Sequence, residues 1–173
     1  MSVLGELQPN KVFKYFEEIC SIPHGSRNLQ QISDYLVDFA KAHELKYRQD
    51  EDLNVIIWKD GSKGYEASEP VILQGHMDMV AVKEGDCDKD MEKEGLDLEI
   101  NGDYISAKGT SLGGDDGIAV AYTLAVLDDE EMAHPPIEAI FTVNEEIGML
   151  GAATIDVSDL KGRLFMNMDS EDE

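Results

Sequence analysis

His76 and Asp78 are the first residues of this sequence whose types and spacing suggest metal-binding or catalytic chemistry. They follow the short apolar run 71–75, which comes after Pro70 and predicts a buried strand. Side chains two positions apart on an extended segment point to the same side, so both can act on one object. A histidine that binds a metal usually donates its second ring N–H to a carboxylate or carbonyl, which Asp78 could supply. Taken alone, the pair could equally be a histidine at a strand end beside a solvated acid, with no metal-binding role.

A second group of carboxylates opens a helix. Asp115 and Asp116 lie in the glycine-rich segment 113–117, just before the very apolar stretch 118–127. The glycines allow a tight turn and a close approach of the main chain, and the two acids lie at the positive end of a helix dipole. One of the two aspartates could be a helix N-cap instead of a ligand.

Carboxylates also end two later apolar runs. Glu145 and Glu146 follow residues 137–143, and Asp169 ends the run 163–169. Successive side chains at the end of a strand diverge, so one glutamate can be a ligand while the other faces a different atom. Because the carboxyl ends of parallel strands meet at one edge of a sheet, we expect these acids and His76 to converge.

The elements that must position these residues predict an α/β fold. The alternation of strands and helices indicates a three-layer domain with a mostly parallel central sheet and helices on both faces. Three helices are expected, at residues 9–20, about 28–40 and 118–127, and Asn28 is the expected N-cap of the second. Strands are expected at 46–49 and 54–59 as an adjacent or antiparallel pair, and then at 71–75, 103–107, 137–143 and 163–169. His24 and His43, at helix ends, are expected to be surface or capping residues.

Several carboxylates converging in a partly buried cleft would repel one another and take up protons unless cations were present. Two divalent metal ions would remove that repulsion. Nitrogen and oxygen ligands without thiolate suit zinc, with manganese or cobalt as alternatives. Cys20 and Cys87 have no CxxC spacing, so neither a disulfide framework nor a thiolate zinc site is indicated.

Composition excludes several kinds of partner. The 173 residues are 42% hydrophobic, which fits one globular domain or most of one. With 14 basic against 37 acidic residues, the net charge of −23 disfavours nucleic acid and anionic membrane surfaces as partners. The sequence has neither a secretory signal pattern nor an apolar run of roughly 20 residues, so we expect a cytoplasmic protein.

Four motifs together resemble the co-catalytic zinc exopeptidases, which include carboxypeptidase, tripeptidase and acylase relatives. They are Gly75-His-Met-Asp78, Gly113-Gly-Asp-Asp-Gly117, Asn144-Glu-Glu-Ile-Gly148 and Met168-Asp-Ser-Glu171. Within that group, the segments 73–80, 109–118 and 169–171 resemble the aminoacyl-histidine dipeptidases most closely.

The resemblance implies a role for each site residue. His76 and Asp169 would bind one zinc ion, Asp115 would bridge two, and Glu146 would bind the second. Asp78 would orient His76, and Glu145 would be the general base. The peptide bond after Asp115 is expected to be cis. Asp116 stands where relatives commonly carry asparagine.

The resemblance also implies that residues 1–173 are the N-terminal portion of a catalytic domain. In the family, a later histidine completes the second zinc site, and a separate lid or dimerisation domain follows this stretch. We therefore expect a full-length homodimer, and a 173-residue piece that binds at most one zinc ion tightly and hydrolyses dipeptides negligibly.

The function that these observations predict is metal-dependent hydrolysis of short peptides, most specifically Xaa-His dipeptides. A related tripeptidase or N-acyl amino-acid deacylase would share every motif. A non-catalytic domain that only binds divalent cations is the alternative from another class.

Overall fold

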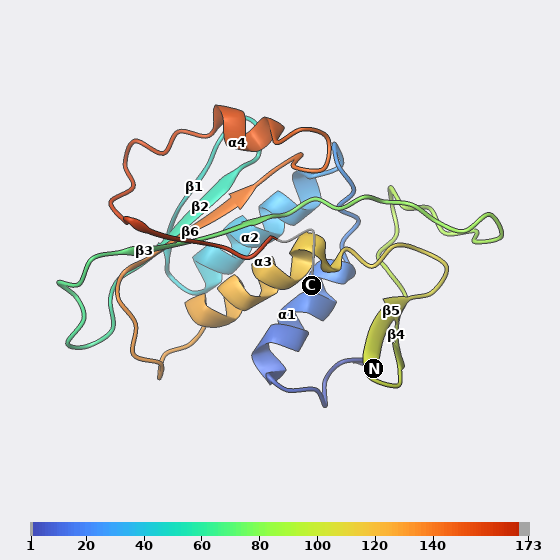
Figure 1. The fold of residues 1–173 in the computed structure, drawn as a ribbon, viewed down its shortest axis with the longest axis horizontal. Coiled ribbons are helices and arrows are strands. Elements are labelled where there is room, and N and C mark those ends of the chain that lie inside the picture. Colours follow the sequence, from blue (N-terminus) through green and yellow to red (C-terminus); the bar gives the residue numbers. More distant parts are fainter. Residues whose placement is uncertain (1, 170–173) are drawn as a thin grey trace.

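The computed structural model of the protein describes residues 2–169, which form one five-stranded sheet, one two-stranded hairpin and four helices (Figure 1). The helices are α1 (Asn10–Cys20), α2 (Gln30–Ala42), α3 (Gly114–Leu127) and α4 (Leu150–Thr154). The strands are β1 (Lys46–Gln49), β2 (Val55–Lys59), β3 (Val71–His76), β4 (Leu98–Asn101), β5 (Tyr104–Ala107), β6 (Ile137–Thr142) and β7 (Leu164–Asn167). No helix within this part of the chain is both long and apolar enough to cross a bilayer.

The main sheet has the strand order β1-β2-β6-β3-β7. Strand β3 runs parallel to both β6 and β7, whereas β2 is antiparallel to β1 and to β6. The expected α/β architecture and the expected antiparallel pair at 46–59 are confirmed. The sheet is mixed, because that pair adds two antiparallel strands to the three parallel ones.

The two faces of the sheet have different covers. Alternate residues of β6 point to opposite faces of the sheet. Ala139 and Phe141 belong to the main core, together with side chains from α1, α2 and α3. Ile140 is buried on the other face. Figure 1 shows α4 and the long segment that follows it on that opposite side. Helices therefore lie on both faces, with the larger core beneath α1, α2 and α3.

Some local expectations were wrong. Asn28 is not the N-cap of α2, because Leu29 precedes the helix and the Asn28 side chain donates instead to the Glu92 carbonyl, 2.9 Å away. His24 is not a surface residue: it is 3% exposed, and its ring lies 2.6 Å from the Ile22 carbonyl. His43 does occupy the C-cap of α2.

Three parallel strands deliver their carboxyl ends to one edge of the sheet, next to the start of α3. The main chain at the end of β3 comes close to α3 at Gly75. A Cβ built on Gly75 would lie 2.9 Å from Asp116 Oδ2 and 3.1 Å from Ala119 Cβ. The missing side chain is therefore what lets α3 pack against the strand that carries His76.

We expect Gly75→Ala to lower the free energy of unfolding by about 1–3 kcal/mol, because a methyl group here overfills a close contact. Chemical denaturation followed by circular dichroism measures the change. Gly85→Ala is the matched control, since a Cβ at Gly85 meets no atom within 4 Å. Equal stability of the two variants would contradict this account of the packing.

Candidate metal centre

His76 lies at the end of β3 with its ring held in one orientation. The side chain is 1% exposed. Its Nδ1 lies 2.9 Å from the main-chain carbonyl of Asp78, and its Nε2 faces Asp115 Oδ1 at 3.1 Å. When Nδ1 carries the proton, it donates to that carbonyl and leaves the Nε2 lone pair directed toward the carboxylates.

The main chain of His76 is fixed by α3. Its N–H donates to Asp116 Oδ2 across 3.0 Å, and Asp116 is buried. The peptide bond between Asp115 and Asp116 is cis, as the resemblance implied. Both aspartates have non-helical dihedral angles at the start of α3, and their carboxylates bond to His76 instead of capping the helix.

The structure brings all of the expected ligand types to this edge of the sheet. Ligand atoms of His76, Asp115 and Glu146 lie within 4.8 Å of one another. A second group within the same limit consists of His76, Glu145 and Asp169. The two groups share His76, and Glu145 and Glu146 belong to different groups. In this geometry Asp169 neighbours Glu145, while Asp115 neighbours Glu146.

Asp78 makes a different set of contacts from the one the sequence suggests. Its Oδ1 lies 3.6 Å from His76 Nδ1, which is longer than the contact that Nδ1 makes with the Asp78 carbonyl. The carboxylate accepts hydrogen bonds from the Ser26 hydroxyl at 2.8 Å and from the Glu145 main-chain N–H at 3.0 Å. Asp78 therefore positions the glutamate loop as well as the histidine.

Sequence reasoning missed Ser26 and the role of Asp116. Ser26 lies in the loop between α1 and α2, far from Asp78 along the chain, and no motif indicates their contact. Asp116 could have been found from the glycine at position 75, because a strand glycine often marks a close approach of another group. The structure shows that this group is the Asp116 carboxylate.

The electrostatics follow from burial and from the crowding of acids. Although burial opposes it, the nearby carboxylates of Asp78, Asp116 and Asp115 favour the charged ring and raise the pKa of His76 to about 9. Burial raises the pKa of Asp116 to about 7. Burial and neighbouring carboxylates also raise the pKa of Glu145 and Glu146. The metal-free site therefore retains protons that a cation would displace.

These residues fit a zinc-type ion. One imidazole nitrogen and four carboxylates suit a borderline divalent cation, and neither group includes a thiolate. Ligand atoms around tetrahedral zinc are about 3.4 Å apart, close to the 3.1 Å between His76 Nε2 and Asp115 Oδ1. The ligand atoms within each group lie up to 4.8 Å apart, so side chains would have to move closer to share an ion, and the 56% exposed Asp115 side chain has room to do so.

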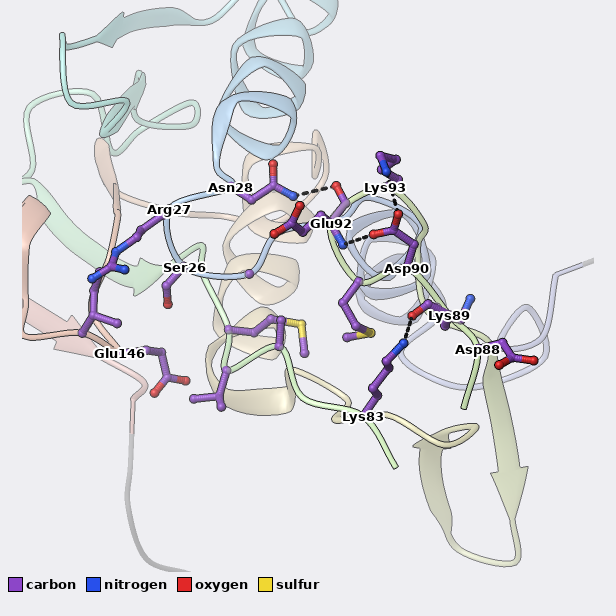
Figure 2. A pocket seen from close by; sticks show the side chains of 16 residues that line it. Ser26, Arg27, Asn28, Lys83, Asp88, Lys89, Asp90, Glu92, Lys93 and Glu146 are labelled. Atoms are coloured by element: carbon purple, nitrogen blue, oxygen red, sulfur yellow. Dashed lines mark hydrogen bonds and ion pairs between the residues drawn. The ribbon is translucent and has the colours of Figure 1, made fainter. Parts of the chain in front are cut away.

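A cleft of about 1240 Å³ opens beside Glu146, one of the candidate ligands (Figure 2). Residues 25–28 and Glu146 with Ile147 line one side of it, and Lys83 with residues 88–93 line the other. The cleft therefore gives a ligand larger than water access to Glu146.

Comparisons with known proteins agree with this geometry. Over all 173 residues the chain is 40% identical to the cytosol non-specific dipeptidase of Escherichia coli. It superposes on the aminoacylhistidine dipeptidase of Vibrio alginolyticus with a TM-score of 0.94 and 40% identity over 98% of its length. Along its whole length the chain is therefore similar to these two dipeptidases.

A more distant structure shares the fold alone. A tripeptidase from Staphylococcus aureus matches 96% of the chain with a TM-score of 0.77 and 23% identity, and 44% of that protein is covered. The chain spans 36% of the E. coli dipeptidase and 35% of the Vibrio one, about a third of each. No family model matches the chain.

The raised pKa of His76 predicts how the metal-free protein responds to pH. The folded state favours the protonated His76 ring, and this preference stabilises the fold. The stabilisation is complete below the unfolded pKa near 6.5 and is lost as the pH rises through the folded pKa of about 9. We expect the free energy of unfolding to fall by up to about 3 kcal/mol across that window. Urea denaturation in the presence of a chelator measures it, with His76→Asn as the control that should flatten the slope. Constant stability of the unsubstituted protein from pH 6.5 to 9 would contradict the assignment.

Proposed function

We propose that the protein carrying this chain hydrolyses dipeptides, with Xaa-His as the preferred class, at a site that binds two zinc ions. Manganese or cobalt could replace zinc. The observation that carries the proposal is that one imidazole and four carboxylates, from His76, Asp115, Glu145, Glu146 and Asp169, gather at one edge of the sheet, and that Glu146 also lines a cleft of about 1240 Å³. The dipeptidase names of the two relatives support the substrate class.

We assign four residues to the metals. His76 and Asp169 would hold one ion, Asp115 would bridge both, and Glu146 would hold the second. Asp78 would orient His76 and the Glu145 loop through the contacts described above. When bound, the ions would polarise the scissile carbonyl and acidify the attacking water.

Glu145 is assigned the proton transfers. Its Oε2 lies 3.9 Å from His76 Nε2. Glu145 belongs to the ligand group with Asp169, whereas Glu146 belongs to the group with Asp115. Burial and neighbouring acids raise its pKa, which brings a carboxylate closer to the range of an effective base at neutral pH. It would take a proton from the attacking water and give it to the amine nitrogen that leaves when the C–N bond breaks.

The proposal extends to the whole protein. We place residues 1–173 in the N-terminal portion of a catalytic domain in a cytoplasmic homodimer, with the dimer contacts in a separate domain. A tripeptidase or N-acyl amino-acid deacylase would use the same chemistry, and a domain that only binds cations would use the same ligands. Substrate profiling of the full-length protein with dipeptides, tripeptides and N-acyl amino acids distinguishes them.

Two neighbouring substitutions test the roles of the glutamates in the full-length protein. Glu145→Gln should keep the metals and lose about 10²–10⁴-fold in kcat, since it removes the general base. Glu146→Gln should instead lower the affinity for the second ion, because a neutral amide is a poorer ligand. Metal analysis after dialysis and dipeptide hydrolysis measure the two effects.

Each variant is the control for the other, because both replace one carboxylate by an amide in the same loop. Adding excess zinc should restore part of the activity of Glu146→Gln and none of that of Glu145→Gln. Full activity in metal-loaded Glu145→Gln would refute its assignment as the base.

A further inference from the structure

A row of polar side chains crosses the sheet just before the candidate ligands, on the face opposite the main core. Leu73 belongs to that core, so its neighbour Gln74 points to the other face. Gln74 pairs with Asn167 in the parallel ladder of β3 and β7. Gln74 precedes His76 by two residues, and Asn167 precedes Asp169 by two. Positions two apart on an extended segment share a face, so the row lies directly behind these candidate ligands.

The side-chain amide of Gln74 links three strands. Its Nε2 donates to Thr142 Oγ1 of β6 across 3.2 Å, and its Oε1 accepts a hydrogen bond from Asn167 Nδ2 of β7. A carboxamide offers a donor and an acceptor together, which a carboxylate or an apolar side chain of similar length does not. Because β3 lies between β6 and β7, one side chain on the middle strand contacts both neighbours.

Few contacts hold the end of β7 from which Asp169 extends. Within residues 2–169, β7 pairs with β3 alone, and all four of its residues are exposed. Its start is anchored, because the buried Glu138 carboxylate accepts hydrogen bonds from the main-chain N–H groups of residues 161–162 at 2.9 to 3.0 Å. The contact between Asn167 and Gln74 is the corresponding anchor at the other end of the strand.

The same polar row lines a small cavity beside the second ligand group. The cavity has a volume of about 210 Å³, and its lining includes Gln74, Thr142, Asn167, Glu145 and Asp169. Glu145 and Asp169 belong to the ligand group of His76, whose ligand atoms lie within 4.8 Å of one another. The cavity leaves the end of β7 room to shift when the row is broken.

We propose that Gln74 is a positioning residue for the metal centre, which holds Asp169 within reach of the ion that His76 would bind. This inference rests on the proposed function for the assignment of Asp169 as a ligand. Gln74 contacts neither the ion nor the peptide in this assignment. It acts through Asn167 and the short segment that leads from there to the carboxylate.

The test is zinc titration of the metal-free full-length protein against a competing chelator, which reads the site without turnover. Gln74→Met keeps the length of the side chain and removes both hydrogen bonds. It should weaken the binding of one zinc ion about 10-fold, the lower end of the usual cost of substitutions behind a ligand.

Gln49→Met is the matched control. Gln49 is a glutamine of β1, at the opposite edge of the same sheet, and its side chain donates to Ser33 and Asp34. This variant removes hydrogen bonds of the same kind far from the candidate ligands, so its zinc affinity should be unchanged. An equal loss of zinc affinity in Gln49→Met and Gln74→Met would overturn the inference.

A double-mutant cycle separates positioning from general support of the fold. In an Asp169→Asn background the ligand charge is gone, so adding Gln74→Met should cost little further zinc affinity. A residue that only stabilises the fold would cost the same in both backgrounds, and that result would overturn the inference. Asn167→Ala should reproduce the effect of Gln74→Met and not add to it. Because Asn167 is exposed, this variant tests the same contact even if Gln74→Met does not fold.

The proposed function and this inference can fail separately. Dipeptide hydrolysis by the unsubstituted protein decides the function, whereas the zinc titrations decide the inference whether or not any peptide is cleaved. A protein that cleaves no dipeptide, but loses zinc affinity through Gln74 only when Asp169 is intact, would refute the function and support the inference. Full zinc affinity in both Gln74→Met and Asn167→Ala would overturn the inference even in an active dipeptidase.

Discussion

The hydrogen bond from the main chain of His76 to the buried Asp116 carboxylate is the contact on which the site depends. It joins the end of β3 to the start of α3, so it fixes His76 and Asp115 relative to each other with one donor and one acceptor. Gly75 makes the approach possible by having no side chain. A buried polar pair of this kind is costly when broken, which makes the position of the histidine specific.

The second constraint is the repulsion among carboxylates gathered at the strand ends. Asp78 is the exception in this group, because the His76 ring, the Glu145 N–H and the Ser26 hydroxyl offset its burial and hold its pKa below the usual range. The remaining acids have fewer donors, so their charge is available to a cation. The fold therefore stabilises the Asp78 carboxylate internally, and the proposed ligands are among the acids that have fewer donors.

Much of this arrangement follows from the sequence, because one rule covers it: residues after parallel strands meet at one edge. That rule places His76, Glu145 and Asp169 without knowledge of any contact. The sequence predicts the strand at 103–107, which is β5, but it reveals neither the partner strand β4 nor the Ser26 contact, since these have no periodic pattern or local motif. Strand order also escaped prediction, because an antiparallel pair can join either edge of a parallel set equally well.

The position of β3 between β6 and β7 has a consequence for how the protein acquires its site. Both partners of β3 come much later in the chain, so a nascent polypeptide carries His76 long before it has Glu145 or Asp169. Large loops must close before these strands pair, and such non-local steps are slow. On the proposed assignment, binding of both ions would follow completion of the sheet. A chain released before β7 would have His76, Asp115, Glu145 and Glu146 but would lack Asp169 and the strand that pairs with the other edge of β3.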